Sequence, residues 1–418
     1  MTKVLPGGYL SGMIGCPPSK SQTHRYLICA ALSDAPSVLH CGTLSRDIQA
    51  TAESLRALGA QIIEKKDALW ISPRRAAAGL CRLPCGESGS TLRFLLPVAA
   101  ALGAEAAFSI SPHLAQRPLQ PLQEQLASHG VSLRREGGTL YCSGKLRPSG
   151  DYTLPGNISS QFISGLLFAL PLLPGDSTLT DTGEVESRPY LDLTEAALRR
   201  CGISFEKNGT VYHIAGRQSY HITGELTTEG DWSSAAPVLC AGALGGEGIT
   251  VTGLEAHSLQ GDRAITDLLR RFGADVKCEE NYVTVRPAQL HGITIDASQI
   301  PDLIPAVSVT AALAEGETRI IHARRLRWKE SDRLHATAEL LHSLGGSAEE
   351  ESDGLVIHGR TVLDGGTADP HGDHRIAMAA AAAACGCRGA VTLFHAECVE
   401  KSYPGFWEDY ALLKGGTL

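Results

Sequence analysis

The residues most able to do chemistry are small polar and cationic side chains that open strongly apolar, helix-like stretches. These openings are Lys20-Ser21, Gly89-Ser90-Thr91, Ser159-Ser160-Gln161, Ser233-Ser234, Pro301-Asp302 and Asp373-His374-Arg375. The start of a helix has free N–H groups and the positive end of the helix dipole, so it binds anions. Arginine adds a planar fork that makes paired hydrogen bonds to phosphate or carboxylate. These residue types therefore predict sites for small polyanions.

Helix capping is the simpler explanation for the serine, threonine and aspartate residues at these openings. It does not explain the cations, because the helix dipole disfavours positive charge at an N-terminal end. The cations in or next to the predicted helix starts are Lys20, Arg25, Arg93, Arg117, Arg333, Arg375 and Lys401. Each cation needs a compensating anion. Since the formal net charge is −8, a general nucleic-acid surface is disfavoured and any bound anion must be held by local charge.

A sixfold repeat positions these openings. Helix-like runs end in glycine at six places with spacings of 70 to 72 residues, at Gly59, Gly130, Gly202, Gly273, Gly345 and Gly415. Such a period indicates one structural unit repeated six times. Two short β-like runs follow most of these glycines, for example 203–206 and 211–214 around Asn208-Gly209, or 131–134 and 140–141 around Gly137-Gly138. Asn-Gly and Gly-Gly between such runs predict hairpins.

The apolar stretches form a second series, out of phase with the glycines. Residues 94–102, 162–173, 304–313 and 376–385 are apolar on nearly every side and are expected to be buried helices, with kinks at Pro97, Pro171 and Pro305. Half-exposed helices such as 193–201 and 265–272 alternate with them, opening near Asp47, Arg117, Ser187, Asp262, Glu330 and Lys401. Each repeat is thus predicted to hold a buried helix, an exposed helix and a small sheet.

Composition is typical of a compact soluble protein with two domains, with 43% hydrophobic and 20% charged residues in 418. We expect no membrane span, because no long apolar run is free of charge, and no signal peptide, because the first residues lack an apolar core. The twelve cysteines are scattered without zinc-ligand spacing, so we expect reduced thiols in a cytoplasmic protein and no metal.

Eight motifs in order resemble the EPSP synthase family of enolpyruvyl transferases, from about residue 10 to residue 410. They are Pro18–Arg25, Gly86–Arg93, Gln116–Pro118, Ser159–Gln161, Ser187–Tyr190, Lys329–Arg333, Asp373–Arg375 and Lys401–Pro404. The resemblance implies an α/β (α+β) fold, a two-domain inside-out α/β barrel of six repeats, each with two helices and a small mixed sheet. Three repeats would form a first domain, 20–229, and three a second domain, 1–19 plus 230–418, to which the first N-terminal strand returns.

The implied reaction transfers the enolpyruvyl group of phosphoenolpyruvate to the 5-hydroxyl of shikimate 3-phosphate and releases phosphate, a step toward chorismate and the aromatic amino acids. By resemblance, the residues binding shikimate 3-phosphate are Lys20, Ser21, Arg25, Ser159, Ser160, Gln161, Ser187, Tyr190, Asp302 and Lys329. Those binding phosphoenolpyruvate are Lys20, Gly89, Arg117, Gln161, Arg333, His374, Arg375 and Lys401. Gly89 fits physically, because a missing side chain lets a ligand approach the backbone N–H. The second domain would hold the catalytic carboxylates and much of the phosphoenolpyruvate site.

The chemistry needs a base at the 5-hydroxyl and an acid at the methylene carbon. The resemblance gives Asp302 the first role and Glu330 the second, helped by Lys20 or Lys401. An acid that donates near neutral pH needs a raised pKa, and the sequence does not say which carboxyl has it. Asp302 could instead be a helix cap, Glu330 a solvated ion pair with Lys329 or Arg333, and His374 a packed core histidine.

Two rival functions remain open at this point. One is the sister transferase acting on UDP-N-acetylglucosamine, which usually has a loop cysteine where this chain has Pro112 and an asparagine where it has Ser21. The other is a non-catalytic anion- or RNA-binding repeat protein. Glu87 departs from the usual Asn or Asp and Arg325 from the Asn of some members, so Glu87 is left out of the predicted site and the sequence does not decide the role of either residue. We expect a monomer with no cofactor, no nucleic-acid partner and the two small-molecule substrates as ligands.

Overall fold

The computed structural model describes residues 1–183 and 186–416. Within this range the chain forms two compact units, each with its own hydrophobic core. The continuous unit comprises residues 18–228, and the discontinuous unit comprises residues 1–17 and 229–418. The chain thus passes from one unit to the other after Pro17 and again after Thr228.

The continuous unit contains three mixed sheets in its described residues. Its helices are α1 (Lys20–Leu32), α2 (Arg46–Ala57), α3 (Gly89–Leu102), α4 (Pro112–Gln116), α5 (Gln120–Ser128), α6 (Ser160–Ala169), the 3-10 turn η1 (Leu170–Leu172) and α7 (Arg188–Arg200). Its strands are β3 (Ser37–His40), β4 (Gln61–Lys65), β5 (Ala68–Ser72), β6 (Cys81–Gly86), β7 (Ala106–Ile110), β8 (Val131–Glu136), β9 (Thr139–Gly144), β10 (Gly150–Pro155), β11 (Ser177–Thr182), β12 (Glu206–Asn208), β13 (Val211–Ile214) and β14 (Leu226–Thr227). The strand orders are β14-β3-β5-β4, β6-β7-β9-β8 and β10-β11-β13-β12.

The discontinuous unit repeats this plan. Its helices are α8 (Trp232–Leu244), η2 (Gly261–Ala264), α9 (Ile265–Phe272), α10 (Ile304–Ala312), η3 (Arg324–Trp328), α11 (Arg333–Ser343), α12 (His374–Ala384), η4 (Ala396–Lys401) and α13 (Phe406–Leu413). Its strands are β1 (Lys3–Leu5), β2 (Gly12–Gly15), β15 (Ile249–Thr252), β16 (Asp275–Cys278), β17 (Tyr282–Arg286), β18 (Thr294–Asp296), β19 (Glu317–Ile321), β20 (Ser347–Glu351), β21 (Gly354–His358), β22 (Gly366–Ala368) and β23 (Val391–Leu393). The strand orders are β16-β17-β15-β2, β18-β19-β21-β20 and β1-β23-β22.

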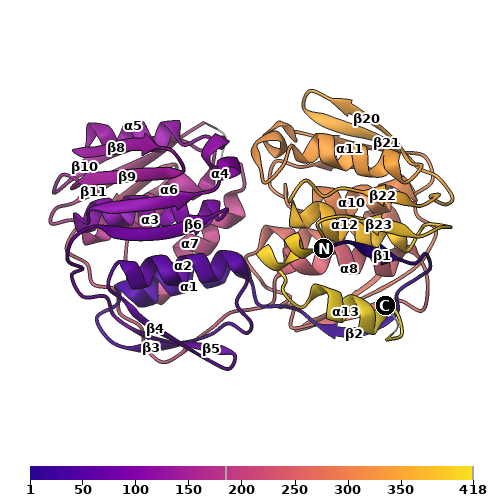
Figure 1. Cartoon of the computed structure of the whole chain (residues 1–418), viewed down its shortest axis with the longest axis horizontal. Helices are drawn as coiled ribbons and strands as arrows, with labels where there is room; N and C mark the ends of the chain where they lie inside the picture. Colours follow the sequence, from indigo (N-terminus) through magenta and orange to yellow (C-terminus); the bar gives the residue numbers. More distant parts are fainter. Residues whose placement is uncertain (184–185, 417–418) are drawn as a thin grey trace. The chain divides into compact units, whose positions relative to one another are not determined.

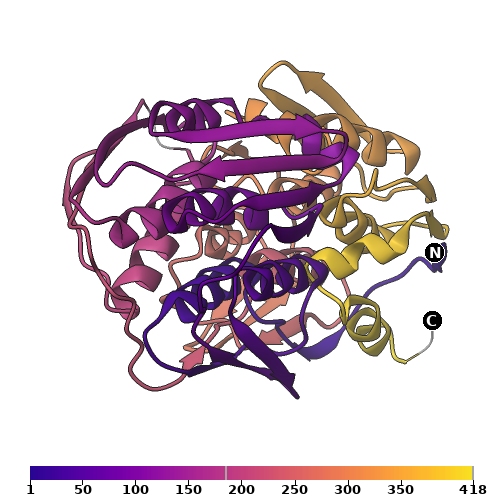
Figure 2. The ribbon, with the colours of Figure 1, turned by 60° about the vertical axis from the view of Figure 1, so that its left-hand side comes forward.

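The predicted α/β fold of six repeats is confirmed by six small mixed sheets with helices among the described residues. In most repeats a buried helix connects two parallel strands, as α3 does between β6 and β7, and a hairpin such as β8–β9 completes the sheet. Figures 1 and 2 show part of one repeat, in which the orange hairpin of β20 and β21 lies beside α11. The last repeat differs, because its sheet has three strands and takes β1 in place of a hairpin.

All six periodic glycines have a positive φ, between 81° at Gly202 and 110° at Gly273. This left-handed backbone ends a helix and is strained for residues with a side chain, so glycine is the natural stop. The spacing of these glycines in the sequence therefore indicates where six of the helices end.

In two repeats, one strand of the sheet comes from a distant part of the sequence. Strand β2 precedes α1 in sequence but pairs in parallel with β15, Ile14 lying opposite Val251. Strand β14 precedes α8 in sequence but pairs in parallel with β3, Leu226 lying opposite Leu39. In each compact unit, the last strand before a connection therefore pairs with a strand that is far away in the sequence but belongs to the same unit.

The buried helices agree with the apolar pattern, apart from two prolines. Pro171 does not kink a long helix, because α6 ends at Ala169 and Pro171 lies in the 3-10 turn η1. Pro305 lies in the first turn of α10, where the backbone N–H has no helical partner to lose. Pro97 is inside α3 as expected.

Four of the exposed helices begin later than their predicted openings, and one of them is α9, which begins at Ile265 while Asp262 lies in η2. Arg117 follows the short helix α4, and α5 begins only at Gln120. Glu330 precedes α11, which begins at Arg333, and Lys401 ends the 3-10 helix η4 five residues before α13. These cations and carboxyl groups therefore stand in short connecting segments, whose backbone is less regular than a helix start.

Buried hydroxyl groups tie the helices of the continuous unit together. Thr51 on α2 bonds to Thr91 on α3 at 2.6 Å and to His24 on α1 at 2.8 Å. Thr194 on α7 likewise bonds to Ser164 on α6 at 2.8 Å. Buried polar groups need such partners, so these bonds fix the mutual positions of helices that carry predicted site residues.

Candidate active site

Lys20, the first residue of α1, already has a protein anion beside it. Its Nζ donates to Asp47 Oδ2 at 3.0 Å, and only 14% and 8% of the two side chains are exposed. Asp47 stands in the first turn of α2, where the helix dipole favours a carboxylate. The compensating anion expected for Lys20 is therefore supplied by the chain itself.

Arg25 is buried in α1 and links α1 to α7. Its Nη1 donates to the Ser21 carbonyl at 2.6 Å, its Nη2 to the Tyr190 carbonyl at 2.7 Å, and its Nε to Thr194 Oγ1 at 2.8 Å. Burial lowers its pKa to about 10, so the guanidinium is still charged at neutral pH. Arg25 thus holds in place the backbone of Ser21 and Tyr190, two of the predicted shikimate 3-phosphate residues.

Two guanidinium groups lie against the start of α3. A Cβ added at Gly89 would be 2.9 Å from Arg117 Nη1 and 3.3 Å from Arg93 Nη1. Any side chain there would have to push Arg117 aside, so the glycine makes room for cations at a helix N-terminus. Charge and free backbone N–H groups meet at this point, which suits a phosphate or carboxylate.

Gln161 bridges α3 and α6 beside these arginines. Its Oε1 accepts from Arg93 Nη1 at 2.7 Å, and its Nε2 donates to Ser90 Oγ at 2.9 Å. The two helices can approach closely because Gly165 has no side chain. A Cβ at this position would lie 2.2 Å from the Arg93 carbonyl oxygen. Figure 1 shows α3 and α6 beside one another. Gln161 and Arg93 are thereby held in one hydrogen-bonded arrangement.

The three predicted phosphate-binding serines all stand at helix starts. Ser159 caps α6, and its hydroxyl oxygen accepts from the Gln161 N–H at 3.3 Å, which leaves its O–H able to donate. Ser160 is the first residue of α6 and is buried. Ser187 precedes α7 in a left-handed conformation, with φ 57° and ψ 41°, and is also buried. Strained backbone of this kind is common at functional sites.

In the discontinuous unit, Arg333 is the centre of a cluster of carboxylates. Its Nη1 donates to Asp302 Oδ1 at 2.5 Å, its Nη2 to Glu330 Oε2 at 2.8 Å and its Nε to Asp373 Oδ2 at 2.7 Å. Arg333 is 1% exposed, and its carboxylate neighbours raise its pKa well above the usual value. The prediction that Arg333 binds phosphoenolpyruvate stays untested, and in this structure its hydrogen bonds go to three carboxylates.

Asp302 does not cap α10. The N-cap residue is Leu303, and the Asp302 carboxylate instead accepts from Arg333 and, at 3.4 Å, from Lys329 Nζ. Burial opposes the charge, but Lys329, Arg333 and Arg375 together hold the pKa of Asp302 well below its usual range. Burial lowers the pKa of Lys329 to about 8, against the pull of Asp302. At neutral pH Asp302 is therefore an ionised carboxylate among cations.

Glu330 makes a partly buried ion pair and not a solvated one. Its Oε2 is 2.8 Å from Arg333 Nη2, and the Glu330 side chain is 16% exposed. Glu330 and Asp302 share Arg333 as their common partner, which fixes both carboxyl groups against one guanidinium.

The motif Asp373-His374-Arg375 opens α12. Asp373 caps the helix through the Arg375 N–H at 2.9 Å and also accepts from Ser331 Oγ at 3.1 Å. His374 is buried, with Nδ1 3.7 Å from Asp373 Oδ1. The Arg375 side chain is 4% exposed, and its Nε and Nη1 are buried without a hydrogen-bond partner among residues 1–183 and 186–416. A buried guanidinium with unused donors is what an anionic ligand requires.

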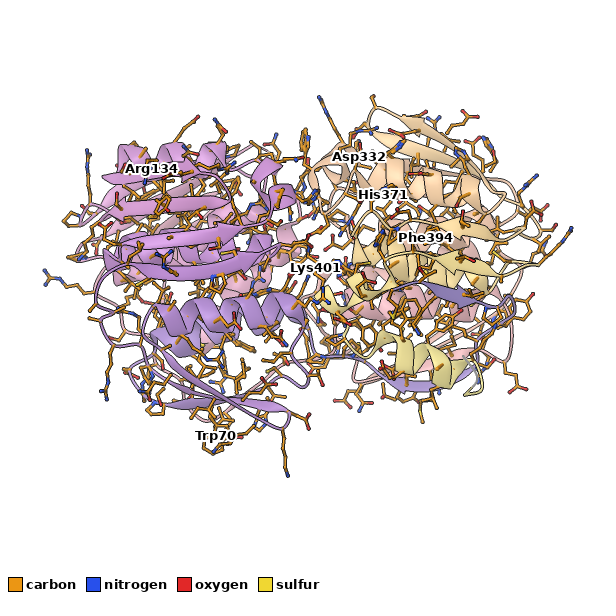
Figure 3. The ribbon with its side chains drawn as sticks, in the orientation of Figure 1. Trp70, Arg134, Asp332, His371, Phe394 and Lys401 are labelled. Carbon is orange, nitrogen blue, oxygen red and sulfur yellow. The ribbon has the colours of Figure 1, made fainter. Side chains whose placement is uncertain are left out.

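Lys401, labelled in Figure 3, is buried at the end of η4. Three more predicted site residues of this unit, Lys329, Glu330 and Arg333, border η3 and α11. Within each unit, then, most of the predicted residues lie at helix starts or in the short segments before them.

Sequence reasoning left three carboxyl groups out of the predicted site. Asp47 pairs with Lys20, Asp373 bonds Arg333, and Asp262 accepts from the Ser233 hydroxyl in the discontinuous unit. All three stand at or beside helix starts that the repeat pattern had marked. The repeat was the signal that could have found them, because it places acidic residues next to the cationic openings.

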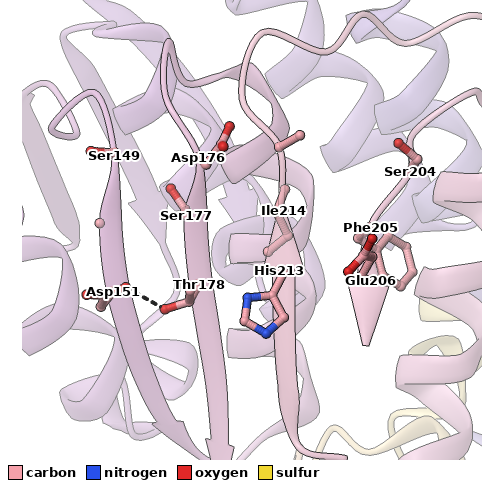
Figure 4. A pocket seen from close by; sticks show the side chains of 12 residues that line it. Ser149, Asp151, Asp176, Ser177, Thr178, Ser204, Phe205, Glu206, His213 and Ile214 are labelled. Carbon is pink, nitrogen blue, oxygen red and sulfur yellow. Dashed lines mark hydrogen bonds between the residues drawn. The ribbon is translucent and has the colours of Figure 1, made fainter. Parts of the chain in front are cut away.

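The continuous unit also has a pocket of about 570 Å³ on the outer side of the β10-β11-β13-β12 sheet. Figure 4 shows Asp151, Thr178 and His213 on its strands, with the hydrogen bond from Thr178 to Asp151. Predicted site residues are missing from its lining, so it is separate from the helix starts described above. No group of three or more potential metal ligands, and no helix long and apolar enough to cross a bilayer, is found in residues 1–183 and 186–416.

Known proteins match this chain over nearly its whole length. The model of the family EPSP synthase (3-phosphoshikimate 1-carboxyvinyltransferase) matches residues 4–410. The 3-phosphoshikimate 1-carboxyvinyltransferase of Clostridium kluyveri is 44% identical over 412 residues, which cover 97% of this chain and 96% of that protein. A solved EPSP synthase from Acinetobacter baumannii has a TM-score of 0.82 at 26% identity, covering 98% and 97% of the two chains.

The fold extends to another transferase. The enolpyruvyl transferase NikO from Streptomyces tendae has a TM-score of 0.77 at 22% identity, covering 99% of this chain and 97% of that one, which shows a shared fold. Six small mixed sheets with helices thus give this chain the type of fold that these solved transferases have. Within that type, the chain belongs to the EPSP synthase family.

Proposed function

We propose that this chain is a transferase of the shikimate pathway that moves the enolpyruvyl group of phosphoenolpyruvate to the 5-hydroxyl of shikimate 3-phosphate and releases phosphate. The observation that carries the proposal is the match to the EPSP synthase family over residues 4–410, together with 44% identity to a curated relative. A match of this length and identity disfavours both the UDP-N-acetylglucosamine transferase and the RNA-binding alternative.

Shikimate 3-phosphate is assigned mainly to the continuous unit. The Ser159, Ser160 and Ser187 hydroxyls stand at helix starts, where backbone N–H groups and the dipole favour a phosphate dianion. Ser21, Tyr190 and Gln161 hold positions fixed by Arg25 and Arg93. Asp302 and Lys329 of the discontinuous unit are assigned to the same substrate, with the Asp302 carboxylate at the 5-hydroxyl.

Phosphoenolpyruvate is assigned to arginine and lysine residues that stand at helix starts or in short segments. Arg117 lies against Gly89 in the continuous unit, where Lys20 also opens a helix. His374 and Arg375 open α12, and Lys401 ends η4. The unused Nε and Nη1 of Arg375 support this assignment most directly, because a carboxylate or phosphate would supply the missing acceptors.

Asp302 suits the role of base because its lowered pKa leaves the carboxylate ionised, and so able to accept a proton, at neutral pH. The step breaks the O–H bond of the 5-hydroxyl and moves the proton to the Asp302 carboxylate. The oxygen of the 5-hydroxyl then forms a bond to C2 of phosphoenolpyruvate. The surrounding cations make Asp302 a weak base in the free protein. Bound phosphate and carboxylate groups offset those cations and strengthen it.

The methylene carbon C3 takes a proton as C2 is attacked, and we assign Glu330 as the donor, helped by Lys20 or Lys401. The same carbon must lose a proton when phosphate leaves, so that the vinyl group is restored. Glu330 is fixed by Arg333 at 2.8 Å. Arg333 donates hydrogen bonds to Asp302, Glu330 and Asp373, and so positions both proposed catalytic carboxyls. It is also a predicted ligand of phosphoenolpyruvate.

Phosphate release with alternative acceptors tests the proposal. The chain is incubated with phosphoenolpyruvate and either shikimate 3-phosphate or UDP-N-acetylglucosamine. Release with the shikimate compound alone is expected. Release with the sugar nucleotide alone would move the chain to the sister activity and overturn the assignments of Ser21, Ser159 and Ser187. We further propose a cytoplasmic monomer, for which gel filtration and cell fractionation are the measurements.

A further inference from the structure

The segment between η3 and α11, residues 329–332, carries two residues of the proposed reaction, Lys329 and Glu330. It forms neither helix nor strand. Irregular segments are more mobile than helices and strands unless other groups hold them. Glu330 nevertheless has to stay beside Arg333, 2.8 Å away, and Lys329 has to stay near Asp302. The groups that hold the ends of segment 329–332 therefore bear on the chemistry.

Arg327 joins the two ends of this segment. It lies on η3, two residues before Lys329, and its Nη1 donates to Asp332 Oδ2 at 3.0 Å. Asp332, labelled in Figure 3, is the N-cap of α11, and its Oδ1 accepts from the His335 N–H at 3.2 Å. One carboxylate therefore caps α11 with one oxygen and binds Arg327 with the other. The segment is thus closed where it leaves η3 and where it enters α11.

The same guanidinium attaches the segment to strand β20. Its Nη1 also donates to Glu350 Oε1 at 2.6 Å, and its Nη2 donates to the Glu351 carbonyl at 2.7 Å. Glu350 Oε2 in turn lies 3.1 Å from His335 Nδ1 on α11. Strand β20 packs against α11, as Figure 1 shows. Arg327 thus has one acceptor at the start of α11 and two on β20, which a planar guanidinium holds in fixed directions.

Surface stabilisation is the simpler explanation for these ion pairs, because Arg327, Asp332 and Glu350 are 23%, 40% and 30% exposed. Exposed ion pairs, however, contribute little to the free energy of folding. Here they enclose the segment that carries the proposed proton donor. Proton transfer needs donor and acceptor within hydrogen-bond reach, and a displacement of about 1 Å can cost about a hundredfold in rate. Ion pairs that add little stability can therefore still decide the rate.

We propose that Arg327 is a positioning residue for the transfer step. By joining Asp332 to η3 and to β20, it fixes segment 329–332 so that Glu330 presents its carboxyl group to the methylene carbon of phosphoenolpyruvate. Arg327 acts through Glu330 and does not itself touch the reacting atoms. This inference rests on the proposed function, in which Glu330 donates the proton to that carbon.

Steady-state kinetics of the native chain, Arg327→Ala and a matched control, Arg319→Ala, test the role. Arg319 lies on β19 and pairs with Glu351 on the same hairpin at 3.0 Å, and within the described part of the chain its side chain makes no hydrogen bond to residues 329–332. We expect kcat to fall roughly tenfold or more in Arg327→Ala, with a much smaller change in the KM for phosphoenolpyruvate, and neither to change in the control. An unchanged kcat in Arg327→Ala, or a rise in KM as large as the fall in kcat, overturns the proposal.

A second variant covers the case in which Arg327→Ala does not fold. Asp332→Asn keeps the cap of α11, because asparagine caps helices as well as aspartate does, but it removes the charge that Arg327 binds. Its kcat should also fall, and the double variant Arg327→Ala/Asp332→Asn should lose less activity than the product of the two single losses, because both remove the same contact. Native activity in Asp332→Asn, or losses that multiply in the double variant, contradicts the proposal.

Hydrogen exchange followed by mass spectrometry does not depend on turnover. A peptide that spans residues 328–332 should exchange faster in Arg327→Ala than in the native chain and in Arg319→Ala, while peptides from the buried helix α12 should stay equally protected in all three. Unchanged exchange of residues 328–332 overturns the inference. Faster exchange in Arg327→Ala, together with a native chain that releases no phosphate from the two substrates, would count against the proposed function alone.

Discussion

Asp302 is the residue whose environment says most about the chemistry. Because of its residue type and its position after Pro301, Asp302 could have been a helix cap. Only the structure shows that its carboxylate accepts hydrogen bonds from Arg333 and Lys329. The sequence could identify the cations and carboxyls of the candidate site through the resemblance. It could not predict that one guanidinium, Arg333, bonds three carboxylates, because those partners are separated by up to 40 residues along the chain.

Replacing Asp302 by asparagine removes the base without changing the size of the side chain. We predict a fall in kcat of about a hundredfold or more, since general base catalysis typically contributes 10² to 10⁴. The KM for phosphoenolpyruvate should change less. Steady-state phosphate release measures both, and Asp302→Glu, which keeps the carboxylate, should retain more activity than Asp302→Asn. Equal kcat in Asp302→Asn and the native chain would remove Asp302 from the mechanism.

The same carboxylate links stability to pH. The pKa of Asp302 is lower in the folded chain than its unfolded value of about 3.9, so its contribution to stability is present above that value. The contribution is lost as pH falls through the lower, folded pKa. We therefore predict that the native chain is more stable than Asp302→Asn at pH 5 to 7, and that the difference shrinks below about pH 4. Urea unfolding at several pH values checks this, and a difference independent of pH would contradict it.

Arg117 and Gly89 give a second prediction at this scale. Arg117→Ala should weaken phosphoenolpyruvate far more than shikimate 3-phosphate, because a charge-assisted hydrogen bond contributes about 1.5 to 3 kcal/mol. Gly89→Ala should act in the same direction, since its Cβ would stand 2.9 Å from Arg117 Nη1. The KM values for the two substrates are the readout. Equal weakening of both substrates by Arg117→Ala would refute the assignment of Arg117.

At the scale of elements, the period in the sequence predicted the helices well and their starts less well. The glycines marked the helix ends because a left-handed residue is needed there. The starts at Glu330 and Lys401 were misplaced because 3-10 turns precede α11 and α13. Short 3-10 segments have no apolar period of their own, so only the structure separates them from the helices that follow.

The contact between α3 and α6 gives a test at this scale. A Cβ at Gly165 would lie 2.2 Å from the Arg93 carbonyl oxygen and 3.1 Å from Pro97 Cγ. We predict that Gly165→Ala lowers the free energy of unfolding by about 1 to 3 kcal/mol, as overpacking does in a close-packed interior. Gly15→Ala is the control, since the nearest atom to its added Cβ is 4.0 Å away. Denaturant unfolding should separate the two variants, and equal stability would show that α3 and α6 can move apart freely.

For the whole molecule, the six repeats and the α/β class followed from the sequence alone. The exchange of β2 and β14 did not follow from periodicity, because a strand that pairs far from its own helix has no local signal. Only the resemblance implied that the first N-terminal strand returns to the second domain. The assignment of each substrate to residues of one unit or the other stays a prediction.

The activity proposed for this chain joins an enolpyruvyl group to shikimate 3-phosphate. The most direct measurement is mass spectrometry of the product formed from phosphoenolpyruvate and shikimate 3-phosphate, with inorganic phosphate counted in the same sample. We expect an adduct heavier than shikimate 3-phosphate by one enolpyruvyl group, with one phosphate released per adduct. Phosphate without an adduct, or an adduct formed only on UDP-N-acetylglucosamine, would contradict it.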